Sequence, residues 1–281
     1  MKVYFANMLG TKGLENYLFN KIDILAAFPS FPKKGVFKPD HCRSLFVDSG
    51  AFGKDSDKVN IHNYIQFLHQ NKSQIGVYAN LDIIGDAKLT YRNQKEMEKN
   101  GLNPIPVFHY ASPIKYLKKY LKDGYSYISL GGMVPITTSQ LQLWLDDLWE
   151  NYLTDEKGFP KIKVHGFGLE IGSLLTRYPW DSIDASSVHM QARYGGIKTP
   201  WGWMKINPNV KADELKWQTP RKLKQVQSFV SGLDFDFSFK EAQEQSVEGT
   251  IKRCCISIRY FTKWMEENKV DRFVKRINSF F

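Results

Sequence analysis

Cysteines, metal-ligand patterns and long hydrophobic runs are all scarce in this sequence of 281 residues. Its three cysteines, Cys42, Cys254 and Cys255, are too few and too poorly spaced for a disulfide framework or a four-ligand zinc site. No His-x-x-x-His pair occurs. No apolar run approaches the roughly 20 residues of a membrane span, and the first residues read as a strand and not as a signal peptide. We therefore expect an intracellular protein with reduced thiols, no metal and no membrane partner.

The charge balance of the chain is strongly basic. Apolar residues make up 42% of the sequence and charged residues 24%, which is typical of a folded globular protein. The net charge of +10 points to a polyanionic partner such as nucleic acid, because Lys and Arg that neutralise phosphates release counterions. One basic cluster spans residues 115–122. A second spans residues 211–224 and includes Lys216, Arg221, Lys222 and Lys224. An ordinary solvated face is the alternative interpretation of each cluster.

Short apolar runs that end in an acid, a histidine or a glycine recur along the chain. The clearest is Leu45 to Val47, which ends at Asp48 and turns at once through Ser49, Gly50 and Ala51. The other runs end at Asp82, at His109, at Gly131-Gly132, at His165-Gly166 and at Asp184. Because the carboxyl ends of parallel strands meet at one face of a barrel, this recurrence predicts a single site built at that face.

Strand and helix patterns alternate regularly between these run ends. We expect strands at residues 3–6, 45–47, 76–81, 104–108, 125–130, 161–164 and 182–185, with 201–206 as the eighth, and helices at 13–20, 60–70, 87–99, 113–122, 141–152 and 171–178. The alternation predicts an α/β fold, a (β/α)8 TIM barrel over about residues 1–210 with extra C-terminal helices over 211–281, in a single domain. An open doubly wound sheet is the alternative, although it would concentrate its site at one switch point.

Three aspartates stand out among the carboxylates near the predicted strand ends. Asp86 and Asp181 are interpreted as helix caps or turn residues, which is the usual role of such an aspartate. Asp48, Asp82 and Asp184 would converge on one pocket in a barrel. Two carboxylates beside a sugar carbon allow one to act as nucleophile and the other as acid and base.

The glycine pair and the histidines have two interpretations each. Gly131-Gly132 would let the backbone approach a flat ligand, because no side chain obstructs its edge. A structural turn is the equal alternative. His109 and His165 could contribute to the pocket or could be buried histidines whose hydrogen bonds are satisfied under the loops.

Four short segments, taken in order, are similar to the motifs of one enzyme family. They are Asp48-Ser49-Gly50-Ala51-Phe52, Leu130-Gly131-Gly132-Met133, Val164-His165-Gly166-Phe167-Gly168, and Asp184 followed after seven residues by Ala192-Arg193-Tyr194-Gly195. Together they resemble the tRNA-guanine transglycosylase (queuine tRNA-ribosyltransferase) superfamily. Members of that superfamily use a (β/α)8 barrel to exchange a guanine for a 7-deazaguanine base.

The resemblance implies a role for each matched residue. Asp184 matches the nucleophile, Asp48 matches the residue with acid/base and base-binding roles, and Asp82 matches the acid that reads the guanine edge. The remaining positions that the resemblance places around the base are Ser49, Gly50, His109, Gly131, Gly132, His165 and Gly166. Arg193 and the second basic cluster would hold phosphates. No cofactor is implied.

Three departures from the family pattern narrow the implied substrate. Ala51 replaces a glycine, His109 stands where the tRNA enzymes have a Gln-Gly pair, and the Cys-Cys-Cys-His zinc subdomain is missing. Because that subdomain supports tRNA binding in the family, the chain looks more like the compact phage and bacterial branch that inserts 7-deazaguanines into DNA.

This branch implies DNA as the partner, with tRNA as the alternative, a base such as 7-cyano-7-deazaguanine, and the cytoplasm of a bacterial or phage-infected host cell. A base-releasing glycosidase and a non-catalytic nucleic-acid-binding barrel are the competing functions. The oligomeric state stays open.

Overall fold

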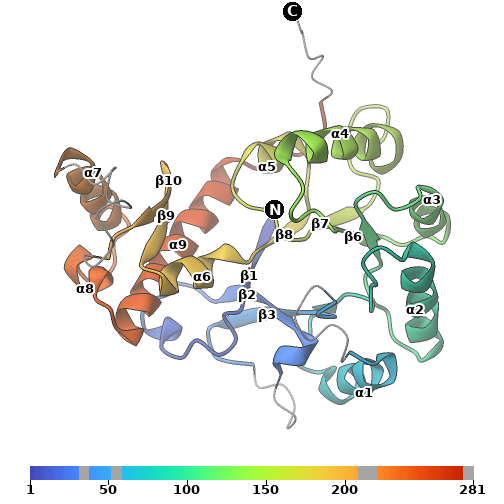
Figure 1. Ribbon diagram of the computed structural model, residues 1–281, viewed down its shortest axis with the longest axis horizontal. Helices are drawn as coiled ribbons and strands as arrows, with labels where there is room; N and C mark the ends of the chain where they lie inside the picture. The colour runs from blue at the N-terminus through green and yellow to red at the C-terminus, as the bar shows by residue number, and fades with distance from the viewer. Residues whose placement is uncertain (32–37, 52–58, 208–219, 275–281) are drawn as a thin grey trace, which may run out of the picture.

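An eight-stranded parallel sheet, curled upon itself and surrounded by helices, forms the framework of the chain (Figure 1). The computed structural model describes residues 1–31, 38–51, 59–207 and 220–274. The strands are β1 (Lys2–Ala6), β2 (Ile22–Ala27), β3 (Cys42–Asp48), β4 (Val77–Tyr78), β5 (Val107–His109), β6 (Tyr127–Gly131), β7 (Lys163–Gly166) and β8 (Ser182–Ala185). Their order across the sheet is β4-β3-β2-β1-β8-β7-β6-β5. The predicted α/β class is confirmed, and the arrangement is consistent with a (β/α)8 fold.

The sheet does not close into the predicted barrel, because the segments of β4 and β5 are joined only by one isolated bridge. Ala79 and Ile105 form that bridge, and the Ile105 amide donates to the carbonyl of Tyr78 at 2.9 Å. The Asn80 amide also donates to the carbonyl of Ile105 at 3.0 Å, whereas the neighbouring Pro106 carbonyl accepts from Ser129 of β6, and the bridge at Ile105 stays isolated. The sheet is therefore curled but not continuously hydrogen-bonded around its circumference.

The helices follow most of the predicted pattern. They are α1 (Ile61–Asn71), α2 (Ala87–Lys99), α3 (Lys115–Lys122), α4 (Thr138–Leu148), α5 (Ser173–Arg177), α6 (Ser187–Arg193), α7 (Pro220–Ser231), α8 (Phe239–Gln243) and α9 (Val247–Glu267), with a π-helical turn η4 (Trp149–Leu153) and short 3-10 segments η1 (Leu14–Asn16) and η2 (Phe28–Ser30). Asp86 caps α2 by accepting from the Leu89 amide at 2.8 Å, which confirms its predicted structural role. In the described part of the chain, no helix combines the length and apolar character that a membrane crossing requires.

The strand count of eight was predicted, but one strand was assigned to the wrong segment. The sequence pattern does not predict β2, and the predicted strand at 201–206 is instead β10 (Gly202–Lys205), which pairs antiparallel with β9 (Gly196–Thr199) in a separate hairpin. The pattern of β2 is disguised because it carries a charged residue, Asp23, which is buried against the guanidinium of Arg43. The helix predicted at 13–20 is only the 3-10 segment η1.

Helix α9 covers the part of the sheet that the β1–β2 connection leaves without a helix. It packs against β1, η1 and β9. The predicted apolar stripe is confirmed, because Ile251, Cys254, Cys255, Ile258, Phe261 and Met265 are all buried. The Phe261 ring meets Phe5 of β1 edge-on at 6.0 Å between centroids.

A buried arginine ties α9 to its neighbours. Arg253 is 1% exposed, and its guanidinium donates to the carbonyls of Ala192 at 2.8 Å, Ala242 at 2.6 Å and Glu244 at 2.8 Å. These carbonyls belong to α6, to α8 and to the residue after α8. One side chain thus links three backbone acceptors from separate segments, of which the Ala192 carbonyl also accepts from the Gly195 amide at 3.1 Å.

We expect Arg253→Met to lower the free energy of unfolding by about 3 kcal/mol, because the buried carbonyls of Ala242 and Glu244 lose their charged donor and the link to α6 is broken. Urea denaturation measures the change. Lys263→Met on the same helix is the matched control: its ion pair with Glu267 is exposed and 3.9 Å long, so it should cost less than about 0.5 kcal/mol. Equal effects of the two substitutions would contradict the assignment.

Candidate active site

A cavity of about 320 Å³ opens at the carboxyl ends of the strands. Its lining includes seven of the predicted site residues, Asp48, Gly50, Asp82, His109, Gly131, Gly132 and Asp184. The curled sheet therefore brings together side chains from β3, β5 and β8 and from the segment after β4. A larger cavity, of about 500 Å³, is lined by Phe19, Arg43 and Arg259 among others and contains none of the predicted site residues.

The turn after β3 aims Asp48 into the cavity. Gly50 has φ +82°, a left-handed conformation that glycine adopts without strain. A Cβ atom at this position would also lie 2.5 Å from Cδ of Pro29. The Gly50 amide in turn donates to Oδ2 of Asp48 at 3.3 Å. The Ser-Gly-Ala turn is thus needed both for the backbone geometry and for holding the carboxylate.

Both oxygens of Asp82 are held by neighbours. The Ser49 hydroxyl donates to Oδ1 at 2.6 Å, and Nε2 of His109 lies 2.8 Å from Oδ2. Ser49 is fully buried and lies behind Asp82, outside the cavity lining. The residue predicted to touch the base therefore orients the carboxylate that faces it.

The pKa of Asp48 is raised by its surroundings. Burial first, and then the nearby charges of Asp82 and Asp184, raise its pKa from 3.8 to about 7, against the opposing effect of the Gly50 amide. A group with a pKa near neutrality can both release and accept a proton under physiological conditions. Asp48 is therefore suited to acid/base chemistry.

One oxygen of Asp184 accepts a backbone hydrogen bond and lies near an imidazole. The Gly168 amide donates to its Oδ1 at 2.7 Å, and Nε2 of His165 lies 3.6 Å from the same oxygen. On the other side of the His165 ring, Nδ1 lies 2.7 Å from the hydroxyl of Ser182, which also bonds to the hydroxyl of Tyr127. A polar chain inside the barrel therefore fixes the imidazole beside Asp184.

Two predicted base-binding residues lie beneath the cavity and not in its lining. His165 is fully buried among the rings of Tyr4, Phe46 and Phe167. A Cβ atom on Gly166 would lie 2.5 Å from Leu169. Both residues therefore support the cavity floor through packing and hydrogen bonding.

Gly131 and Gly132, at the end of β6, pack closely against His109. A Cβ on Gly131 would lie 3.1 Å from the His109 ring, and one on Gly132 would lie 3.2 Å from Cβ of His109. Gly132 has φ +67°. The Gly131 carbonyl is already bonded to the Tyr110 amide at 2.9 Å. Gly132 therefore offers the better approach to the main chain for a flat ligand in the cavity.

Several lining residues escaped prediction as site residues. They are Asn7, Phe167, Gly168 and Ser186, among others. Each follows directly, or within two residues, the end of a strand, which is the signal that could have identified them. The sequence pattern emphasises acids and glycine pairs, so aromatic and amide side chains in the same position are overlooked.

The predicted phosphate-binding residues lie outside the cavity. Arg193 is exposed at the end of α6, and Arg221, Lys222 and Lys224 are on α7. Lys216 lies outside the described residues, as does Phe52 of the first motif. The structure thus separates the described cations from the three aspartates.

Comparison of the chain with protein-family models and with curated proteins finds no match in either case. Within the described residues, no group of three or more His, Cys, Asp or Glu side chains is placed to hold a metal ion. The chemistry of the site therefore has to be argued from the carboxylates, the histidines and the backbone amides themselves.

The raised pKa of Asp48 predicts a pH-dependent stability. Between pH 4 and pH 7 the folded chain retains a proton that the unfolded chain has lost, so the free energy of unfolding falls as the pH rises and levels off above about pH 7. Asp48→Asn cannot ionise. It should exceed the wild type in stability by about 1 to 3 kcal/mol at pH 8, with the advantage vanishing near pH 4.

Urea denaturation across this pH range measures the difference. Asp40→Asn, at an exposed aspartate, is the control and should track the wild type at each pH. A constant offset between Asp48→Asn and the wild type at all pH values would contradict the raised pKa.

Proposed function

We propose that this chain is a base-exchange glycosyltransferase that replaces guanine in DNA with a 7-deazaguanine derivative through a covalent aspartyl-sugar intermediate. The proposal agrees with the resemblance of its motifs to the tRNA-guanine transglycosylase superfamily. The observation that carries it is the pairing of two unlike carboxylates at one cavity. Asp184 accepts an amide hydrogen bond, and Asp48 has a pKa near 7.

The first half of the reaction breaks the bond between the sugar and guanine. The target nucleotide is extruded from its stack so that C1′ enters the cavity. The Asp184 carboxylate attacks C1′, and the bond from C1′ to N9 breaks with its electron pair leaving on the guanine. Protonated Asp48 supplies the proton that neutralises this leaving group.

The second half restores the nucleotide with a new base. The incoming 7-deazaguanine transfers its N9 proton to the Asp48 carboxylate, and N9 attacks C1′. The ester bond to Asp184 breaks, and its electron pair returns to the carboxylate. Two inversions retain the β configuration, and Asp48 ends the cycle protonated, as it began.

The base is held by groups whose positions do not change during the cycle. Ser49 and His109 orient Asp82, whose remaining lone pairs can accept from the N–H groups of a guanine-like edge. The backbone of Gly132 lies at the same cavity. The volume of about 320 Å³ falls at the lower end of small-ligand pockets and suits one base with its sugar.

Incubation with labelled guanine and, separately, with duplex DNA and tRNA tests the proposal. Label retained in DNA supports it. Label retained in tRNA means that the same base exchange takes place on tRNA, the alternative substrate. Release of free guanine without incorporation indicates the base-releasing glycosidase, and neither label nor release indicates a binding role.

Asp184→Ala should abolish incorporation and leave nucleic-acid binding intact, because it removes the nucleophile and no phosphate contact. Asp181→Ala is the matched control on the segment that leads into the same strand. Asp181 lies near Lys163 at 3.9 Å, and its carbonyl accepts from the Lys2 amide at the amino end of β1, away from the cavity. Retained incorporation by Asp184→Ala would remove Asp184 from the role of nucleophile.

The hydroxyl of Ser182 should act through His165 as a positioning group. We expect Ser182→Ala to lower kcat of the exchange about tenfold with KM unchanged, because the imidazole beside Asp184 loses its fixed orientation. Ser129→Ala is the control. Ser129 is equally buried and is paired in register with His165, and its hydroxyl has no hydrogen-bond partner among the described residues. A matching loss in both variants would indicate a general packing effect.

A further inference from the structure

A groove separate from the cavity with the three aspartates lies between the β9–β10 hairpin and α7. Its volume is about 760 Å³, and it is lined by Trp201, Arg221, Lys224, Gln225, Ser228 and Phe229. Among these described lining residues there is no carboxylate. The groove therefore combines an aromatic wall with two cations and neutral polar groups.

Trp201 presents a broad aromatic surface to solvent. It lies between the two strands of the hairpin and is 56% exposed. Its contact with Phe229 is edge-on, with 6.2 Å between ring centroids, and Phe229 is backed in turn by Tyr260 at 5.6 Å. The indole is thus braced through its contact with Phe229 while most of its surface stays accessible.

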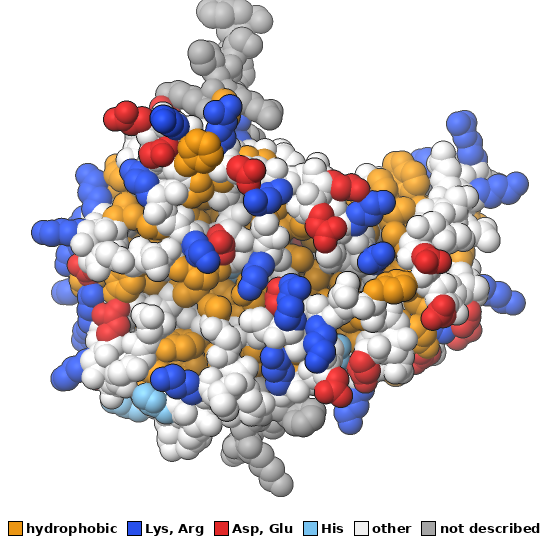
Figure 2. All heavy atoms as spheres, turned by 180° about the vertical axis from the view of Figure 1, so that it is seen from behind, with side chains coloured by type: hydrophobic (Ala, Val, Ile, Leu, Met, Phe, Trp, Pro, Cys, Tyr) orange, Lys and Arg blue, Asp and Glu red, His pale blue; other side chains and the backbone are white. Residues whose placement is uncertain are grey.

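The chain around the groove carries an excess of positive charge. Arg221 and Lys224 are three residues apart on α7 and so lie on the same face of the helix. Within the described residues, neither forms an ion pair with a carboxylate. Residues 185–233 hold eight Lys and Arg against two acidic residues. On the back of the molecule, by contrast, Lys and Arg are interspersed with Asp and Glu (Figure 2).

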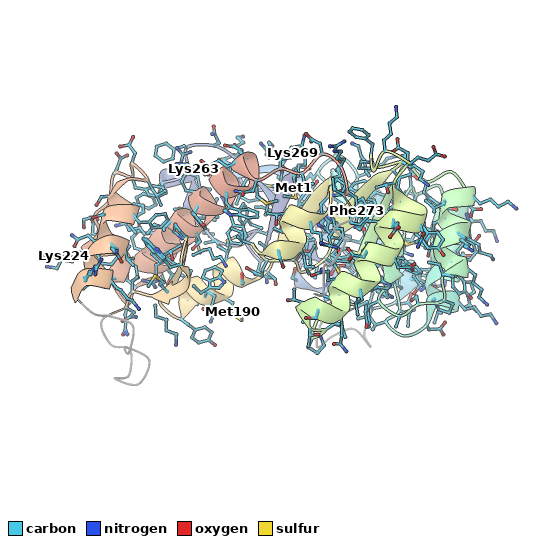
Figure 3. The ribbon with its side chains drawn as sticks, turned by 90° about the horizontal axis from the view of Figure 1, so that it is seen from above. Met1, Met190, Lys224, Lys263, Lys269 and Phe273 are labelled. Atoms are coloured by element: carbon cyan, nitrogen blue, oxygen red, sulfur yellow. The ribbon has the colours of Figure 1, made fainter. Side chains whose placement is uncertain are left out.

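A short run of the chain leads from the cavity to the groove. Ser186 lines the cavity, and α6 begins at the next residue and leads through β9 to Trp201. Along this run Met190 is 52% and Tyr194 is 71% exposed. Met190 projects from the lower edge in Figure 3, opposite the edge that carries Met1 and Lys263. Exposed apolar and aromatic side chains therefore extend from the site toward the groove.

We propose that the groove binds a single-stranded segment of the polynucleotide beside the target nucleotide. One base stacks on Trp201, and Arg221 and Lys224 bind the adjoining phosphates. A duplex offers phosphates but keeps its base faces stacked on one another, so an exposed indole favours unpaired bases. The choice of a polynucleotide as partner rests on the proposed function.

Fluorescence anisotropy with a labelled single strand of about 20 thymidines, and with a duplex of equal length, tests the inference. We expect Trp201→Ala to weaken single-strand binding about tenfold or more, the usual effect of losing one stacked base, and to leave duplex binding unchanged. Phe159→Ala is the matched control. Phe159 is an aromatic residue of similar exposure, 45%, in the turn before β7, and its substitution should change neither affinity.

The salt dependence of single-strand binding tests Arg221 and Lys224 separately from Trp201. Arg221→Gln and Lys224→Gln should each reduce the slope of log K against log salt by about 0.7 on the single strand, whereas Trp201→Ala should leave the slope unchanged. Single-strand affinity of Trp201→Ala equal to that of the wild type overturns the inference. So does a loss of self-association in Trp201→Ala, seen by sedimentation, because the groove would then bind a second copy of the chain.

The base-exchange assay on the same preparations separates the two proposals. If the wild type incorporates guanine into DNA while Trp201→Ala binds single strands normally, only the groove inference fails. If the wild type incorporates nothing but its single-strand binding depends on Trp201, the groove stands and the proposed function fails.

Discussion

Three carboxylates that share one partly desolvated cavity impose the main electrostatic constraint on this protein. Asp48, Asp82 and Asp184 repel one another, and each loses contact with water. The structure resolves the conflict by giving Asp82 two close neighbours, Ser49 and His109, and by giving Asp184 the amide of Gly168 at 2.7 Å. The contact of Asp48 with the Gly50 amide is longer, at 3.3 Å, and the pKa of Asp48 is raised to about 7. The three carboxylates therefore receive unequal support from neighbouring donors.

The two edge strands of the curled sheet, β4 and β5, meet close to the site. The segments of β4 and β5 are joined by one isolated bridge, and Asp82 and His109 stand beyond the end of β4 and at the end of β5. Their 2.8 Å contact spans the same gap on the carboxyl side. The interaction that orients Asp82 therefore also links the two edges of the sheet. On the other side of the molecule, α9 and Arg253 supply packing that the missing β1–β2 helix does not.

Local sequence signals are sufficient for elements whose pattern is set by their own residues. The predicted bounds of α2, residues 87–99, are confirmed, because Asp86 caps its first turn and Gly101 follows its end. The stripe on α9 is likewise predicted from its spacing. The signals fail for β2, which carries a buried Asp23 near its start that pairs with Arg43 of the next strand. They fail again at 201–206, where the apolar pattern belongs to a hairpin outside the sheet.

An apolar run followed by an acid and a glycine turn is a local pattern, so the amino-acid sequence alone identifies the residues at the ends of buried strands. That pattern is enough to single out Asp48, Asp82, His109 and Asp184. Their surroundings were decided by the folded arrangement, which places Ser49 against Asp82 and His165 near Asp184 and raises the pKa of Asp48. These properties depend on through-space distances and burial among residues far apart in the chain, which no local pattern encodes.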